Sequence, residues 1–154
     1  MSHAFWDWSL EVYDQPAMRE ACLSLQDTHG LNVNICLWCA WLAQEGRDPR
    51  GLLPDAIERL EPWSADITRA IRKVRRQLKD AGGNPQLYKA ILACELDAEH
   101  IEQDLLFELS ETAPPAGDAE SLAAAALGDY ARLAGVNADF TEFLESVFLG
   151  VKKV

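Results

Sequence analysis

The stretch Asn32–Glu45, which reads NVNICLWCAWLAQE, decides the fold of this chain. Over the length of a helix its apolar residues fall on every face, whereas a helix at the surface keeps one face polar. Gly46 follows directly and can adopt the left-handed conformation that ends many helices. We therefore expect a helix here, buried at the centre of the protein.

Helical signals recur on both sides of this stretch, while alternating strand patterns and Asn-Gly hairpin turns are missing. Pro16 and Pro85 suit the first turn of a helix, and Asn84 can cap the second of these helices. The predicted fold class is all-α, a single-domain bundle of about seven helices. The expected ranges are 4–13, 16–28, 32–45, a short piece at 55–60 interrupted at Pro62, a longer helix to 80, 85–111, 120–134 and 138–151.

The longest expected helix, 85–111, carries an apolar stripe that steps by threes and fours and should face the core. The members of this stripe are Leu87, Ile91, Cys94, Ala98, Ile101, Leu105 and Leu109. Residues 112–118, TAPPAGD, then form a linker. Residues 118–154 could therefore be a separate C-terminal helical pair, but they are too few for an independent domain.

Size and charge limit the classes of function. The 154 residues are 49% hydrophobic, which is enough for one core, and their net charge of −11 opposes general binding to nucleic acids or anionic membranes. No apolar run approaches the roughly 20 residues that span a bilayer. The first fifteen residues contain no Lys or Arg, so they lack the basic start of a secretory signal. We expect a cytoplasmic protein.

Basic residues are concentrated on one predicted helix, which carries six of the fourteen in the chain. Most of them lie opposite an apolar face, so the helix is amphipathic. Such a basic face commonly pairs with acidic side chains of the same chain, or it docks an acidic protein partner or a small anion. The residues predicted to contact a partner are Arg69, Arg72, Lys73, Arg76 and Lys79.

The buried stretch also suggests a pocket. Aromatic side chains around a polar group can line a ligand site, although such aromatics more often belong to the core. Asn34, Trp38 and Trp41 form the candidate pocket.

Metal-binding patterns are incomplete in this sequence. Cys36 and Cys39 have the spacing of redox and zinc motifs, but no strand precedes their helix, and zinc would need further ligands from distant segments. Asp97, His100 and Asp104 share a helix face and resemble half of a di-metal pattern whose second half is missing. We expect no metal or cofactor, reduced core cysteines, and a solvated charged face around His100.

The N-terminal third resembles a bacterial family classed as a domain of unknown function, number 2390. The resemblance rests on Phe5-Trp6-x-x-Ser9-x-x-x-Tyr13, Gly30-x-x-Val33-Asn34 and the closing pair Trp41-Leu42. It covers roughly residues 5–45. Membership implies a short all-helical protein and no established activity, so the resemblance assigns no catalytic residue.

No phosphate-binding, serine-nucleophile or HExxH motif is present. We therefore predict a small regulatory or adaptor protein that acts through protein–protein interaction, with the basic helix as its contact surface. The alternative is a small-molecule- or metal-binding helical protein, which could be an enzyme, using the pocket lined by the Trp-rich helix.

Overall fold

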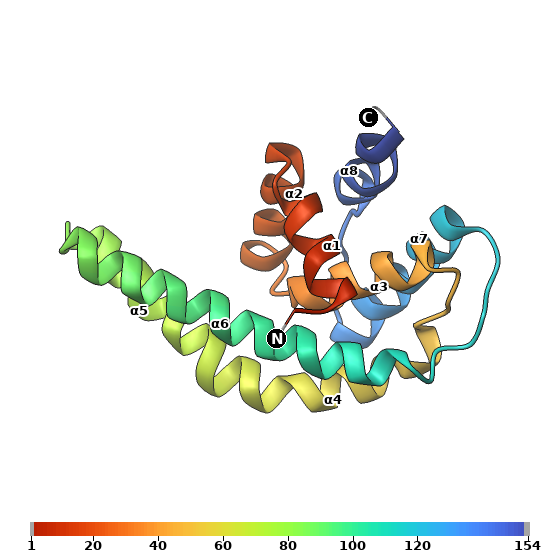
Figure 1. The fold of residues 1–154 in the computed structure, drawn as a ribbon, viewed down its shortest axis with the longest axis horizontal. Helices are drawn as coiled ribbons and strands as arrows, with labels where there is room; N and C mark the ends of the chain where they lie inside the picture. Colours follow the sequence, from red (N-terminus) through yellow and green to blue (C-terminus); the bar gives the residue numbers. More distant parts are fainter. Residues whose placement is uncertain (1, 153–154) are drawn as a thin grey trace.

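The computed structural model describes residues 2–152, and the side chains of residues 2–148. This part of the chain is all-α, as predicted (Figure 1). The α-helices are α1 (Ala4–Tyr13), α2 (Pro16–Asp27), α3 (Val33–Gln44), α4 (Leu53–Trp63), α5 (Arg69–Asp80), α6 (Pro85–Ser110), α7 (Ala119–Ala134) and α8 (Thr141–Lys152). Because α4 and α5 are joined end to end by a helical segment, these elements form seven continuous helices within the described residues, which confirms the predicted architecture.

Helix α3 is the centre of the fold, and the prediction of its burial is confirmed. Every residue from Asn34 to Ala43 is buried. Helix α7 packs along α3, and α6 and α1 also contact it. The indole of Trp38 is fully buried and donates a hydrogen bond of 2.7 Å to the hydroxyl of Ser110 in α6.

The predicted interruption at Pro62 is wrong. The helix continues through this proline, and the next five residues, Ser64–Thr68, form a π-helical segment, η2, that leads directly into α5. Proline lacks the N–H that the preceding turn would accept and its ring crowds that turn, so a local change of helical geometry accommodates it. The helix changes direction at this segment (Figure 1).

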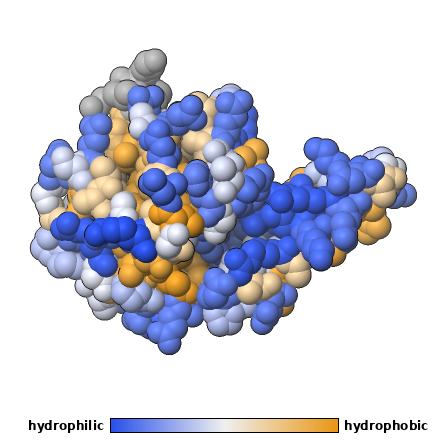
Figure 2. All heavy atoms as spheres, turned by 180° about the vertical axis from the view of Figure 1, so that it is seen from behind, coloured by the Kyte–Doolittle hydropathy of each residue, from blue (hydrophilic) through white to orange (hydrophobic). Residues whose placement is uncertain are grey.

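Helix α5 and the first half of α6 project from the body as a two-helix arm (Figure 1). At its tip Gly82 has a φ of +68°, and the N–H of Gly83 donates to the carbonyl of Leu78 at 2.9 Å. This is the hydrogen-bond pattern of a helix end closed by a left-handed glycine. In Figure 2, which shows the opposite face, the surface of the arm is mostly hydrophilic.

The predicted core stripe of α6 is only partly correct. Leu109 is buried, but Leu87 and Ile101 are 51% and 41% exposed, and Cys94 is exposed. Leu87 and Cys94 lie in the first half of α6, which packs on α5 in the arm (Figure 1). Ile101 lies in the second half, where Glu102 and Leu106 are buried in place of Ile101 and Leu105. Two acidic side chains, Glu95 and Glu102, are buried instead.

The segment after α6 is held by the loop that follows α3. The N–H of Asp48 donates to the carbonyl of Pro114 and the N–H of Ala116 to that of Gly46, both at 2.8 Å. Beyond this segment, α7 packs on α3 and α8 on α2, so the two C-terminal helices cover the N-terminal ones. Across residues 2–152, no helix combines the length and the apolar character needed to cross a bilayer.

Candidate functional site

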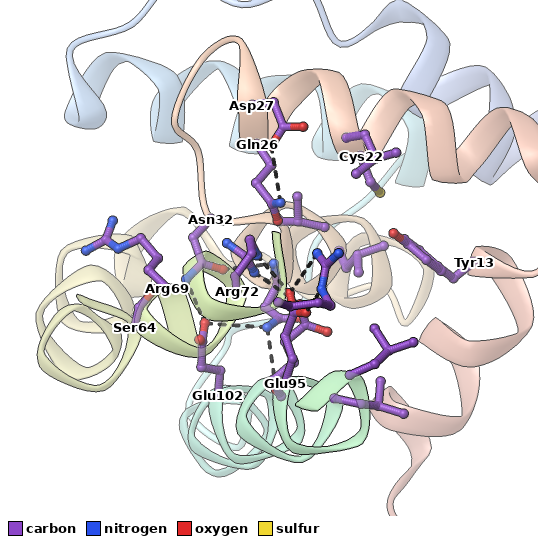
Figure 3. Close-up of a pocket in the computed structure, with 18 of the residues that line it drawn as sticks. Tyr13, Cys22, Gln26, Asp27, Asn32, Ser64, Arg69, Arg72, Glu95 and Glu102 are labelled. Atoms are coloured by element: carbon purple, nitrogen blue, oxygen red, sulfur yellow. Dashed lines mark hydrogen bonds and ion pairs between the residues drawn. The ribbon is translucent and has the colours of Figure 1, made fainter. Parts of the chain in front are cut away.

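A cleft of about 1020 Å³ lies between the arm and the body (Figure 3). Helices α1 and α2 form one wall, α5 and α6 form the other, and the start of α3 lies between them. Large apolar side chains of both walls line the cleft while remaining 37–49% exposed. They are Leu10, Tyr13, Leu23, Leu92 and Leu96.

Ion pairs between α5 and α6 form the arm side of the cleft. Arg72 Nε lies 2.9 Å from a carboxylate oxygen of Glu95, and Arg72 Nη2 lies 3.2 Å from Glu99. Arg75 also donates to Glu95, whose side chain is only 7% exposed. Figure 3 shows Arg72 and Glu95 pointing toward each other between the two helices. The buried carboxylate of Glu95 is therefore shared by two guanidinium groups.

A second polar network joins the start of α3 to α6. Asn32 Nδ2 donates to Glu102 Oε1 at 2.7 Å, and Asn34 Nδ2 approaches the same oxygen at 3.4 Å. Gln103 Nε2 donates to Asn34 Oδ1 and to Ser9 Oγ, both at 3.0 Å. Glu102 is 1% exposed. Its carboxylate is therefore stabilised by amide donors, and no ion pair involves it among the described side chains.

Glu99 is the group in the cleft that can exchange a proton near neutral pH. Its pKa is raised to about 7, mainly by burial and also by the negative charges of Glu95 and Glu102, while the nearby guanidinium of Arg72 opposes the increase. A carboxyl group with such a pKa can act as an acid or a base at physiological pH. It also makes the stability of the protein dependent on pH.

Replacing Glu99 with glutamine should remove this dependence. Below pH 4.5 the carboxyl is neutral in both folded and unfolded chains. As the pH rises toward 7, it ionises first in the unfolded chain, so the wild-type protein loses stability that the variant keeps. The full shift corresponds to about 3 kcal/mol, and because the side chain is 31% exposed we expect about 2 kcal/mol.

The measurement is urea unfolding of the wild-type and E99Q proteins at pH 5 and pH 8. The difference in free energy of unfolding should be small at pH 5 and should favour E99Q at pH 8. A difference that is the same at both pH values would show that the pKa of Glu99 is not raised.

The structure brings most of the predicted partner-binding residues to the cleft. Arg69, Arg72, Lys73 and Arg76 line it, whereas Lys79 does not. Arg69 pairs with Glu61 at 2.5 Å, and Arg76 pairs across the cleft with Asp27 of α2 at 2.6 Å. Among the described side chains, no ion pair involves Lys73.

The candidate pocket residues are divided between the cleft and the core. Asn34 lines the cleft and takes part in its polar network. Trp38 lies in the core against Ser110, and Trp41 packs with Phe5 at a ring-centre distance of 5.2 Å. The two indoles fill the core because α3 is covered on all sides, so neither reaches the cleft.

The metal candidates do not form a single site. Cys36 and Cys39 are fully buried, and burial raises the pKa of both thiols, so they stay protonated and inert. Asp97 is exposed. His100 and Asp104 do come together, and a residue that sequence reasoning missed, His3, joins them.

Sequence reasoning also missed Arg75, Glu95 and Glu102 as parts of the cleft. Each occurs in a charged run whose ordinary location is a solvated helix face. The spacing of Glu95 and Glu102, two turns apart on the same side of α6, is the one signal in the sequence that could have placed them together.

A family model described as "Protein of unknown function (DUF2390)" matches residues 4–106. The chain belongs to this family. The match confirms the family resemblance predicted from the sequence and extends far beyond residues 5–45, through α1–α5 and most of α6. The helices that form both walls of the cleft therefore lie within the matched region. No curated protein and no solved structure matches the chain.

Proposed function

We propose that this DUF2390 protein is a protein-binding adaptor whose cleft holds an amphipathic helix of a partner protein, with acidic side chains beside its apolar face. The observation that carries the proposal is the set of large apolar side chains that line both walls and stay exposed. A contiguous patch of exposed apolar side chains is typical of an interaction site, whereas isolated exposed apolar side chains are common on protein surfaces.

The shape of the cleft favours a helix. Leu92 and Leu96 lie one turn apart on α6, and Leu10 and Tyr13 lie one turn apart on α1 across the cleft. Such rows of side chains form ridges between which the apolar side chains of another helix can pack. The volume of about 1020 Å³ slightly exceeds the range of roughly 300–1,000 Å³ for small-molecule pockets.

The charges that line the cleft indicate which residues the polar side of the partner helix carries. Lys73 and Lys89 line the cleft, and no ion pair involves either lysine among the described side chains. This is notable in a chain with 25 acidic residues and only 14 Lys and Arg. Both lysines are exposed and can meet acidic groups of a partner without being buried.

The alternative of a small-molecule pocket has less support, because Trp38 and Trp41 are packed in the core and do not line the cleft. The cleft contains no nucleophile–base pair among the described residues either. Glu99 can transfer a proton near neutral pH, but a single carboxyl does not define a reaction.

Selection from a phage-displayed library of amphipathic helical peptides tests the proposal. The library keeps leucines at helical spacing and varies the flanking residues. Selected peptides should be rich in Asp and Glu, and L96E should weaken their binding to the full chain at least tenfold, because a charge would replace an apolar contact. Fluorescence polarisation measures the affinity.

Two matched controls make the result specific. Leu133 is 55% exposed on α7 and does not line the cleft, so L133E should leave peptide affinity unchanged. K73E should weaken binding, whereas K79E, on the same helix but outside the cleft, should not. Peptides that bind L96E and L133E equally well would contradict the proposal, and so would a failure to select any peptide.

A further inference from the structure

A cluster of metal-ligating side chains lies where α1 begins against α6. His3 Nε2 is 2.9 Å and His100 Nε2 is 3.5 Å from the same oxygen, Oδ1 of Asp104. All three ligand atoms lie within 4.8 Å of one another. Around a tetrahedral zinc ion with bonds of about 2.1 Å, neighbouring ligand atoms lie about 3.4 Å apart. The cluster therefore approaches the geometry of a site with two imidazoles and one carboxylate.

Aromatic packing fixes both imidazole rings. His100 stacks on Trp6 with ring centres 3.9 Å apart and planes at 3°. His3 stacks on Phe107 at 4.3 Å and 12°. The two imidazoles meet edge to face, at a ring-centre distance of 5.8 Å. Rings held in this way lose less conformational freedom when they bind an ion than rings that rotate freely would lose.

The tautomer of the neutral His3 ring sets the main cost of metal binding. Its Nδ1 accepts a hydrogen bond from the backbone N–H of Trp6 at 3.1 Å, so in the neutral ring the proton is on Nε2 and is donated to Asp104. A metal on Nε2 requires the proton on Nδ1, which removes this helix cap. Losing a cap costs about a factor of five in equilibrium constant, which is small beside the free energy with which zinc binds protein ligands.

We propose that His3, His100 and Asp104 bind a divalent transition-metal ion of the zinc type, with a fourth position open to solvent. Two imidazoles and a carboxylate without thiolate suit Zn²⁺ and its neighbours and are a poor set for Mg²⁺ or Ca²⁺. Asp104 is 40% exposed, which leaves access from solvent. This site is distinct from the polar network of the cleft, and it does not depend on the proposed binding of a helix.

Calorimetric titration of the full chain with Zn²⁺ tests the site. The protein carries no polyhistidine tag, has C94S to remove the exposed thiol, and is treated with a chelator and desalted first. One equivalent of Zn²⁺ should bind. H100F keeps an aromatic ring for Trp6 to stack on and D104N keeps an oxygen for His3, yet each removes a ligand, so each should weaken binding at least tenfold.

The third histidine provides the control. His29 is outside the cluster, so H29Q should bind Zn²⁺ with unchanged affinity. Co²⁺ added to the C94S protein without ligand substitutions should give visible d–d absorption, a measurement that does not depend on whether the variants fold. If no saturable binding of one equivalent of Zn²⁺ is observed, the proposal is wrong and the cluster only joins α1 to α6 by hydrogen bonds. Equal affinity in C94S, H100F and D104N would also overturn the proposal.

Discussion

Replacing Glu95 with alanine should destabilise the arm by about 3 kcal/mol. The carboxylate of Glu95 is the shared acceptor of Arg72 and Arg75, whose side chains are only 14% and 17% exposed. Without it, two guanidinium groups face each other in a partly buried space and lose their strongest acceptor. Because the arginines retain some exposure, the expected cost lies at the low end of the range for breaking a buried ion pair.

The location of the effect is as informative as its size. No residue of α5 is buried, so apolar packing contributes little to holding α5 against α6. Hydrogen exchange should therefore accelerate at the backbone amides of 69–96 while α3 in the body stays protected. Urea unfolding followed by circular dichroism gives the free energy.

Glu108 offers a matched control, since it is an exposed glutamate on the same helix. The E108A protein should be as stable as the wild type within about 0.5 kcal/mol. If the arm unfolds no more readily in E95A than in E108A, the ion pairs of Arg72 and Arg75 with Glu95 do not stabilise the arm.

The sequence was sufficient to predict the centre of the fold and most of the helices, the continuous helix through Pro62 being the exception. Apolar residues on every side of 32–45 exclude a surface location for that helix. The structure places the helix in the core. Glycines mark where helices end because only they take positive φ without strain; Gly46 and Gly135 both have φ of +73°. These signals are local, so they can be read without knowing the packing.

The arm and the cleft could not be predicted, because they depend on which segments meet. Leu87 looks like a core residue by spacing, and only the projection of the arm explains its exposure. Glu95 and Glu102 look solvated by type, and only their partners from α5 and from the start of α3 explain their burial. His3 and Asp104 meet although most of the chain separates them in sequence. Periodicity and composition contain no information about such pairs.

Replacing Asn32 with alanine should destabilise the whole protein by about 3 kcal/mol, because one side chain makes two separate contributions. Its Oδ1 caps α3 by accepting from the N–H groups of Asn34 and Ile35, at 2.9 and 3.3 Å. Its Nδ2 is the closer of the two amide donors to the buried carboxylate of Glu102. A cap is worth about 1 kcal/mol, and a buried charge that loses its main donor costs about 2 kcal/mol more. Thermal and urea unfolding measure the loss.

Variants that change only one contribution separate the two. N32S keeps a capping oxygen but has no amide to donate to Glu102, so it should lose about 2 kcal/mol. In an E102Q background the same N32S substitution should cost clearly less, because the group left without its donor is then an uncharged amide. If N32S costs the same in both backgrounds, the hydrogen bond from Asn32 does not stabilise the charge of Glu102. The body and the cleft share this network through Asn34 and Gln103, so a cost that disappears with the charge would also show that the cleft depends on the hydrogen bond between Asn32 and Glu102.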